Sequence, residues 1–324
     1  MPTSFTNGDS AVPLIRAAGV TGPIIPWRDI LHEGPVPAGL PLEELRAVRA
    51  AFLAQPGWNP YDRVLMELTE RDDALARAFE GDEVILWFEH DLYDQLQLIQ
   101  ILDWCATHER GAYHFTLICG REYLGASTPE RLAERLLERV AITDVQIDIA
   151  VAAWAAFRSP DPVDIVRFLP RETMALPFVM PALRRHLQQF PSTHNGLSRS
   201  QQYGLEAIAS GITVLRQVYP AAHHQREDPI WLGDLGFARH LEALSQVAVP
   251  LLTLADGSPL GVSGVDGAEY WRQEVRLTDA GRAVLAGTAD QVALNGIDHW
   301  LGGAQLTANQ YWRWDDSAAQ LLQC

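Results

Sequence analysis

The chain has 324 residues, of which 48% are apolar, 20% charged and 9% aromatic, so it can bury one large core or two smaller ones. This composition excludes low-complexity disorder, because aromatic residues occur along the whole length and their burial can offset the entropy of ordering. Its 41 acidic residues against 25 basic ones give a net charge of −16, which disfavours nucleic acid as a partner.

Every basic residue is arginine, and lysine is absent from the sequence. This excludes both the lysine of a phosphate-binding loop and the Schiff-base lysine that holds pyridoxal phosphate. The sequence also lacks the G-x-G-x-x-G fingerprint, so we expect neither an NAD nor a pyridoxal phosphate cofactor. Any anion would have to be bound by arginine or by backbone N–H groups.

The cysteines and the N-terminus indicate the cellular compartment. Cys105, Cys119 and Cys324 are odd in number and lack C-x-x-C spacing, so neither a disulfide framework nor a thiolate zinc site is expected. The first residues lack the basic and apolar segments of a signal peptide, and no apolar run reaches the ~18 residues of a membrane span. We therefore expect a cytoplasmic protein without a membrane partner.

Residues 1–143 alternate short apolar segments with helical patterns. The segments expected to form strands are Thr3–Thr6, Val20–Ile25, Val84–Phe88 and Phe115–Cys119. The segments with an apolar spacing near 3.6 residues, typical of helices, are Ala11–Ala17, Leu42–Leu53, Asp73–Phe79, Leu92–Cys105 and Pro129–Val140. This alternation favours a parallel sheet with helices on both faces, and we predict a Rossmann-like α/β domain.

Two further sections follow this domain. Residues 144–190 have a helical pattern interrupted by prolines and are expected to form a helical connector. Residues 191–324 predict a winged-helix-like domain, in which Ser198 and Gln201 form a capping box for a helix to about Ala209. The other expected elements are a helix at Leu235–Ser245, a two-stranded wing from Val247–Leu254 and Glu274–Leu277, and a last helix that opens at Thr278.

Several long motifs resemble one bacterial family. They are Thr6-Asn7-Gly8-Asp9-Ser10 and the stretches 27–35, 87–96, 190–198 and 294–303. The chain resembles the family called domain of unknown function 1835, followed by the partner called domain of unknown function 3658. The resemblance runs nearly from end to end. It implies a two-part arrangement and no established activity.

Polar residues follow each of the four predicted strands. They are Gly8, Asp9, Ser10, Arg28, Asp29, His32, Glu33, Glu89, His90, Asp91 and Arg121. Ligands of open parallel sheets bind beyond the carboxyl ends of the strands. Because neighbouring charges must pair or shift their pKa values, we expect a functional site at this edge. We expect Asp9 or Ser10, His32 or Glu33, and Glu89 or His90 to share one pocket.

Three chemistries are compatible with these residues. In the first, Ser10 is a nucleophile served by Asp29-x-x-His32; alternatively, Asp9 or Ser10 only caps the following helix. In the second, His32, Glu33, Glu89, His90 and Asp91 form an acid–base centre or bind a divalent metal. Alternatively, Asp91 and Asp94 mark a helix start, as cap and first-turn acid.

The third chemistry is the binding of a phosphorylated or nucleotide-like ligand. Arg28 and Arg121 would bind its anionic group, and the turn at Gly8 would present backbone amides. The alternative for Arg28 is an ion pair with Asp29, Glu33 or Glu89.

We favour an enzyme, a hydrolase that acts on an ester or phosphoester small molecule at this edge. The alternative is a ligand-sensing or transcription-regulatory protein that uses the winged-helix-like domain. From His186 onward the sequence has 8 Arg against 14 acidic residues, and DNA-reading domains are usually basic. Nucleic acid is therefore not expected as a partner, whereas a homo-oligomer is compatible with the sequence.

Overall fold

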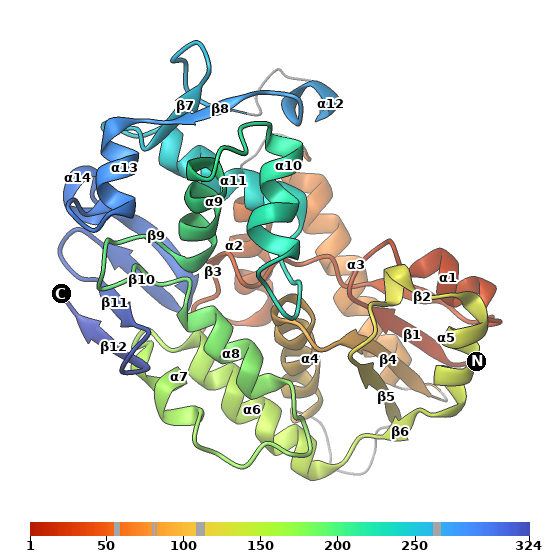
Figure 1. Cartoon of the computed structure of the whole chain (residues 1–324). Coiled ribbons are helices and arrows are strands. Elements are labelled where there is room, and N and C mark those ends of the chain that lie inside the picture. The colour runs from red at the N-terminus through yellow and green to blue at the C-terminus, as the bar shows by residue number, and fades with distance from the viewer. Residues whose placement is uncertain (55–58, 80, 82, 108–113, 262–266) are drawn as a thin grey trace. The chain divides into compact units, whose positions relative to one another are not determined.

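The computed structural model describes residues 1–54, 59–79, 81, 83–107, 114–261 and 267–324 (Figure 1). The fold is mixed α/β, with a five-stranded, mostly parallel sheet and many helices. The chain forms two compact units. Unit 1 contains residues 1–184 and 300–305, and unit 2 contains residues 185–299 and 306–324. The residues expected as a connector thus fall within unit 1 as far as Arg184, and the predicted domain boundaries stay predictions.

The five-stranded sheet lies at the centre of unit 1. Its strands run in the order β2 (Ile24–Pro26), β1 (Thr3–Thr6), β4 (Val84–Glu89), β5 (Phe115–Gly120) and β6 (Val140–Ala141). The first four are parallel, and β6 pairs antiparallel with β5. The four predicted strands are confirmed, although β2 begins at Ile24 rather than Val20. All four parallel strands therefore end at one edge of the sheet.

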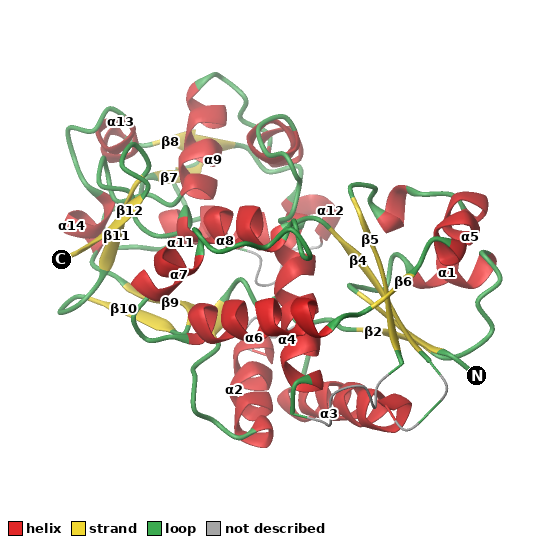
Figure 2. Ribbon diagram, turned by 90° about the horizontal axis from the view of Figure 1, so that it is seen from below, coloured by secondary structure: helices red, strands yellow, loops and turns green. Residues whose placement is uncertain are grey.

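Helices cover both faces of this sheet (Figure 2). The covering helices are α1 (Val12–Ala17) and α5 (Pro129–Leu137) on one face, and α3 (Tyr61–Phe79) and α4 (Leu92–Cys105) on the other. Strand β4 is buried along its whole length, as a parallel strand between two helical layers requires. Ile85 and Trp87 pack in the core beside α1 and α5.

The rest of unit 1 is mainly helical. Its further elements are α2 (Leu42–Ala54), the 3-10 helix η1 (Leu124–Ala126), α6 (Asp144–Arg158), α7 (Val163–Phe168) and α8 (Val179–Leu187), which runs on past Arg184. Strand β3 (Gly34–Pro35) pairs in parallel with β9 (Asp298–Gly302), which pairs with β10 (Ala304–Thr307).

Unit 2 contains short helices and two antiparallel strand pairs. Its helices are α9 (Arg199–Ala209), α10 (Leu215–Tyr219), the π-helix η2 (Pro220–His224), α11 (Asp234–Ser245), α12 (Gly267–Tyr270), α13 (Asp279–Leu285) and α14 (Gln291–Asn295). Its strand pairs are β7 (Leu252–Leu254) with β8 (Val275–Leu277), and β11 (Trp312–Asp315) with β12 (Gln320–Gln323). The predicted capping box of Ser198 and Gln201 is confirmed.

Three expectations are wrong. Helix α3 begins at Tyr61 rather than Asp73, because Val64 and Leu68 extend its buried face toward the N-terminus. The helix that opens at Thr278 was the last element expected, and strands β9, β10, β11 and β12 were not predicted. Neither Asp9 nor Ser10 caps α1, whose N-cap is Ala11 without a side-chain hydrogen bond.

Among the described residues, no helix combines the length and apolar character that a membrane crossing requires.

Candidate functional site

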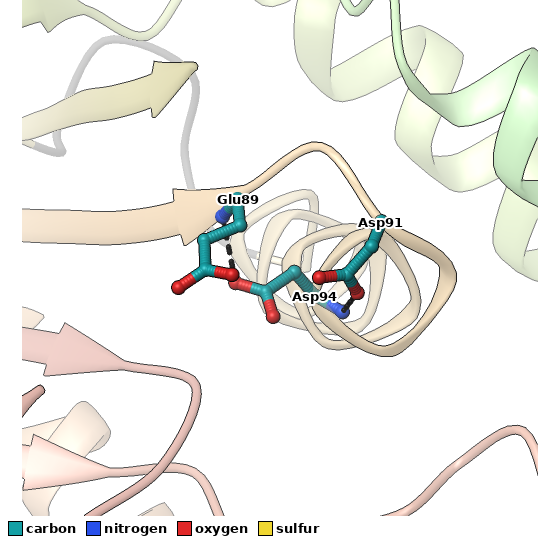
Figure 3. Close-up of side chains that lie close together, drawn as sticks. All are labelled: Glu89, Asp91 and Asp94. Carbon is teal, nitrogen blue, oxygen red and sulfur yellow. Dashed lines mark hydrogen bonds between the residues drawn. The ribbon is translucent and has the colours of Figure 1, made fainter. Parts of the chain in front are cut away.

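Three buried carboxylates come together where β4 ends and α4 begins (Figure 3). Glu89 is the last residue of β4, Asp91 is the N-cap of α4, and Asp94 lies in its first turn. One oxygen of each lies within 4.8 Å of the others. Their exposed fractions are only 5%, 4% and 0% in this order. Glu89, Asp91 and Asp94 are termed the carboxylate cluster below.

The start of α4 explains why these side chains meet. The backbone N–H of Asp94 donates to Asp91 Oδ1 at 3.1 Å, which is the bond of an N-cap with the third residue of its helix. This bond confirms the helix-start reading of Asp91. The Asp94 side chain reaches back along the chain, and its Oδ1 accepts from the Glu89 backbone N–H at 2.6 Å. The carboxylates are thus fixed by the turn between β4 and α4.

The segments after β1 and β5 complete the cluster's surroundings. Asn7 Nδ2 donates to Asp94 Oδ2 at 2.8 Å, and the backbone N–H of Leu124 donates to Glu89 Oε1 at 2.7 Å. The Tyr93 hydroxyl donates to the backbone carbonyl of Asn7 at 3.2 Å. Three of the four loops at this edge of the sheet therefore converge, as the strand topology requires.

The carboxylates of the cluster are poor acids. Burial is the largest cause that raises the pKa of Glu89, and it raises the pKa values of Asp91 and Asp94 well above the usual range. The neighbouring carboxylates raise the Asp91 and Asp94 values further. The nearby arginines Arg28 and Arg49 pair with other carboxylates, those of Asp9 and Asp29. The three side chains therefore take up protons more readily than free carboxylates do.

We expect the metal-free protein to lose stability, relative to Asp91→Asn, as the pH rises above about 4, the unfolded-state pKa of a carboxyl group. Raised pKa values mean that the folded chain binds more protons than the unfolded chain in this window. Protonation of the cluster thus stabilises the fold at low pH, and this contribution disappears as the pH passes the folded-state values. Urea unfolding in EDTA at about pH 5 and about pH 8 measures the difference. If the free energy of unfolding changed with pH identically in the wild type and in Asp91→Asn, the raised pKa of the Asp91 carboxyl group would be contradicted.

The predicted histidines border the same turn. The ring of His32 packs edge-on against Tyr93 at 5.7 Å, and the ring of His90 contacts that of Tyr123 at 5.5 Å. Both histidines are buried, as is Glu33, which is 8% exposed. His32 thus packs against a tyrosine in the first turn of α4 and His90 against one in the loop after β5, and Tyr93 links His32 to Asn7.

The first loop and Arg28 lie at the exposed part of this edge. Arg28 Nη2 and Nε donate to the two carboxylate oxygens of Asp9 at 2.6 and 2.9 Å, and both side chains are exposed. The expected ion pair of Arg28 with Asp29, Glu33 or Glu89 is wrong, because the guanidinium pairs with Asp9. The φ of Arg28 is 51°, in the left-handed region that L residues rarely adopt. Such strain is found more often at functional sites.

Three further predicted residues lie away from the cluster's direct contacts. Gly8 is half-buried in the turn after β1. Ser10 is exposed, and its Oγ lies 3.1 Å from the position that a Cβ on Gly125 would take. The Arg121 guanidinium lies 5.8 Å above the ring of Phe178.

Asp29 is a structural residue in this fold. Its Oδ1 accepts from Arg49 Nη2 at 2.7 Å and from Arg49 Nε at 3.1 Å, and Arg71 lies 4.0 Å away. Asp29 and Arg49 are each 1% exposed. The bidentate pair satisfies the Asp29 carboxylate within the interior of unit 1 and removes the basis for its role as the partner of His32.

The cluster has the chemistry of a site for a hard divalent cation. Carboxylate oxygens are preferred ligands of Mg²⁺, Mn²⁺ and Ca²⁺, and ligands on opposite sides of such an ion lie about 4–5 Å apart. The separation of at most 4.8 Å fits this range. Burial raises the pKa of the neighbouring Cys119 to about 12, so thiolate ligation or attack is not expected there.

The sequence reading missed Asn7 and Asp94 as members of the site. Asp94 was interpreted only as an acid near the positive end of the helix dipole, which its bond to the Glu89 N–H does not require. Its position three residues after the N-cap was the available signal, because a side chain there can fold back over the cap. Nothing in the local pattern distinguishes Asn7 from an ordinary turn residue.

No protein-family model matches the chain, and the comparison with curated proteins finds no match. The resemblance to the family called domain of unknown function 1835 therefore stays a prediction. Function has to be inferred from the geometry of the site.

Proposed function

We propose that unit 1 is a hydrolase that cleaves an ester or phosphoester at the carboxyl edge of its sheet, with a divalent cation held by the carboxylate cluster. The observation that carries this proposal is the convergence of the three buried carboxylates within 4.8 Å at that edge. Burying like charges together destabilises a fold, and such an arrangement is a common property of sites selected for function.

A cation would resolve the electrostatic conflict within the cluster. It would balance the like charges that lie together there, with Glu89, Asp91 and Asp94 as its ligands. When bound, a divalent ion polarises an ester or phosphoryl oxygen and lowers the pKa of a bound water. Asn7 would position Asp94 for this task through its 2.8 Å hydrogen bond.

The remaining groups suggest how the protein assists hydrolysis. His32 and His90 border the cluster and are candidates for proton transfer to and from water and leaving group. Water is the favoured nucleophile, because Asp29 is bound to Arg49 and is thereby taken from the Asp29-x-x-His32 arrangement that would serve Ser10. Arg28 is the candidate ligand for an anionic substrate group, since its exposed guanidinium can exchange Asp9 for a phosphate.

The experiment is an assay of the purified chain with p-nitrophenyl phosphate, bis(p-nitrophenyl) phosphate and p-nitrophenyl acetate. Each substrate is tested with Mg²⁺, with Mn²⁺ and with EDTA, in the wild type and in Asp91→Asn. We expect cation-dependent turnover of at least one substrate that Asp91→Asn loses. Turnover that persists in EDTA and in Asp91→Asn would overturn the role of the cluster.

We expect Arg28→Gln to raise the KM for a phosphoester by about 10- to 100-fold with a smaller change in kcat, because a charged hydrogen bond contributes roughly 1.5–3 kcal/mol. The comparison variant is Arg16→Gln, whose guanidinium donates to the carbonyls of Val20 and Gly22. Steady-state kinetics of both variants measure the effect. An unchanged KM in Arg28→Gln would show that Arg28 does not bind the substrate.

We also propose a cellular location, a family and a fold type for the protein. We infer a cytoplasmic, two-part member of the family called domain of unknown function 1835 with a domain of unknown function 3658, acting on a small molecule. The order and pairing of β2, β1, β4 and β5 support a Rossmann-like domain. Helices α9, α11 and α13 with the antiparallel pair β7–β8 support a winged-helix-like arrangement in unit 2.

The winged-helix-like arrangement favours one alternative function, a transcription regulator. The acidic composition from His186 onward opposes it, so we expect only weak duplex DNA binding that disappears at physiological salt. An electrophoretic mobility-shift titration across salt concentrations measures this. A sequence-selective complex that survives physiological salt would replace the hydrolase proposal with the regulator.

A further inference from the structure

A cavity of about 250 Å³ lies in unit 1 beside the end of β5. Its walls come from β5, from α5 and from residues Ala175–Phe178, which precede α8. Its volume approaches that of small-molecule sites and can hold a ligand of roughly eight to ten non-hydrogen atoms, given about 30 Å³ for each water in the liquid. The cavity is distinct from the carboxylate cluster, whose three residues do not line it.

The lining combines an apolar body with one arginine and one glutamate, Arg135 and Glu138. Leu117, Ile118 and Leu176 are buried and form much of the apolar wall, and Arg135 of α5 is the arginine that lines the cavity. Arg135 Nη1 forms an ion pair with Glu138 at 3.3 Å, and the Glu138 side chain is 54% exposed. An exposed pair of this kind contributes little and exchanges readily for another anion.

A glycine makes room for this guanidinium. A Cβ on Gly120, the last residue of β5, would lie 2.5 Å from Arg135 Nη2. Gly120 therefore allows the Arg135 guanidinium to lie directly against the end of the strand. Any larger residue at this position would displace the arginine head group from its place beside the cavity.

We propose that this cavity binds a small monocarboxylate with an apolar body, whose carboxylate pairs with Arg135. One guanidinium matches one carboxylate by two parallel hydrogen bonds, and the neighbouring Glu138 opposes the second charge of a phosphate. The apolar walls fit a short acyl chain or a single ring. This site does not depend on the proposed hydrolase.

The cavity adjoins residues that position the carboxylate cluster. Gln95 lines the cavity and donates to the backbone carbonyl of Glu89 at 2.6 Å, and Phe178 lines it and packs against His90 at 5.7 Å. Cys119 also lines the cavity and lies 3.6 Å from the same Glu89 carbonyl. An occupant would therefore contact side chains that in turn contact Glu89 and His90.

The test is a calorimetric titration of the full chain with hexanoate, with hexan-1-ol as an uncharged probe of the same chain length. We expect saturable binding of hexanoate at millimolar concentration, weaker binding of hexan-1-ol, and a loss of about ten-fold or more in hexanoate affinity in Arg135→Gln. The matched control is Arg131→Gln, on the same helix but outside the cavity lining, which should bind hexanoate as the wild type does.

A second variant keeps the proposal open to contradiction if Arg135→Gln fails to fold. Ala175→Trp places a bulky side chain at the cavity wall and should abolish binding of both probes. The proposal is overturned if hexanoate does not bind, if hexan-1-ol binds equally well, or if Arg135→Gln or Ala175→Trp binds hexanoate like the wild type. Asp91→Asn should bind hexanoate normally, so a failed hydrolase proposal and a failed cavity proposal give different results.

Discussion

Arg49→Met is expected to lower the free energy of unfolding by about 3–5 kcal/mol, because it removes the guanidinium that hydrogen-bonds the buried Asp29 carboxylate and leaves only Arg71 at 4.0 Å. The two side chains are each 1% exposed, and Arg49 also donates to the backbone carbonyl of Glu33 at 2.8 Å. This guanidinium therefore ties α2 to the loop that carries His32 and Glu33. Urea unfolding followed by circular dichroism measures the change.

The double variant Asp29→Asn with Arg49→Met is the matched control for this pair. It removes the uncompensated charge and should recover part of the stability that Arg49→Met loses. A loss of less than about 1 kcal/mol in Arg49→Met would contradict the structural role. If the Asp29→Asn protein kept full stability but lost turnover, Asp29 would have a catalytic role.

Asp91→Asn is expected to lower cation-dependent turnover by at least about 100-fold, because it removes one charged ligand from the proposed site. It should also stabilise the metal-free chain at neutral pH by about 0.5–2 kcal/mol. Asparagine retains the oxygen that caps α4 through the Asp94 N–H, and its amide can donate to Glu89 where two carboxylates now face each other. Loss of activity with a gain of stability distinguishes a functional residue from a structural one.

Two other variants serve as comparisons for Asp91→Asn. Asp9→Asn changes an exposed carboxylate outside the cluster and should leave cation-dependent stabilisation intact. Asp91→Ala removes the helix cap as well as the charge, so it should be less stable than Asp91→Asn by about 1 kcal/mol. Thermal unfolding in EDTA and in Mn²⁺ compares the variants directly. An Asp91→Asn protein that is less stable than the wild type in EDTA would indicate a structural carboxylate.

The turn between β4 and α4 could be predicted from the sequence because its signals are local. An apolar run of strand length, the acid Asp91 and a helical repeat follow each other directly, and the structure confirms the expected limits of α4. Glu89 and Asp91 were accordingly among the predicted site residues. Asp94 was not, because its role depends on a side chain that folds back toward the end of the preceding strand.

The partner of Asp29 could not be predicted in this way. Arg49 lies twenty residues along the chain and reaches Asp29 only through the packing of α2, which no local pattern specifies. The exposed pair of Asp9 and Arg28 likewise joins two loops that follow different strands. Pairing between distant charges is decided by the tertiary fold, so the alternative partners expected for Arg28, which were Asp29, Glu33 and Glu89, did not include Asp9.

The missed C-terminal strands had a signal of a different kind. In β11, Trp312 and Trp314 are buried, and the residue that follows each of them, Arg313 or Asp315, is half-buried. This is the two-residue alternation of a strand. Four residues are too few for this alternation to stand out from a loop that seals a core. The antiparallel partner β12 is what makes the strand.

Calorimetric titration of the metal-free chain with Mn²⁺ is the most direct measurement of the proposed cation site. We expect one saturable site in the wild type and in Asp9→Asn, and no binding at the same concentrations in Asp91→Asn. A wild-type chain that binds no divalent cation, or an Asp91→Asn protein that binds Mn²⁺ as tightly as the wild type, would contradict the assignment of Glu89, Asp91 and Asp94 as a cation site.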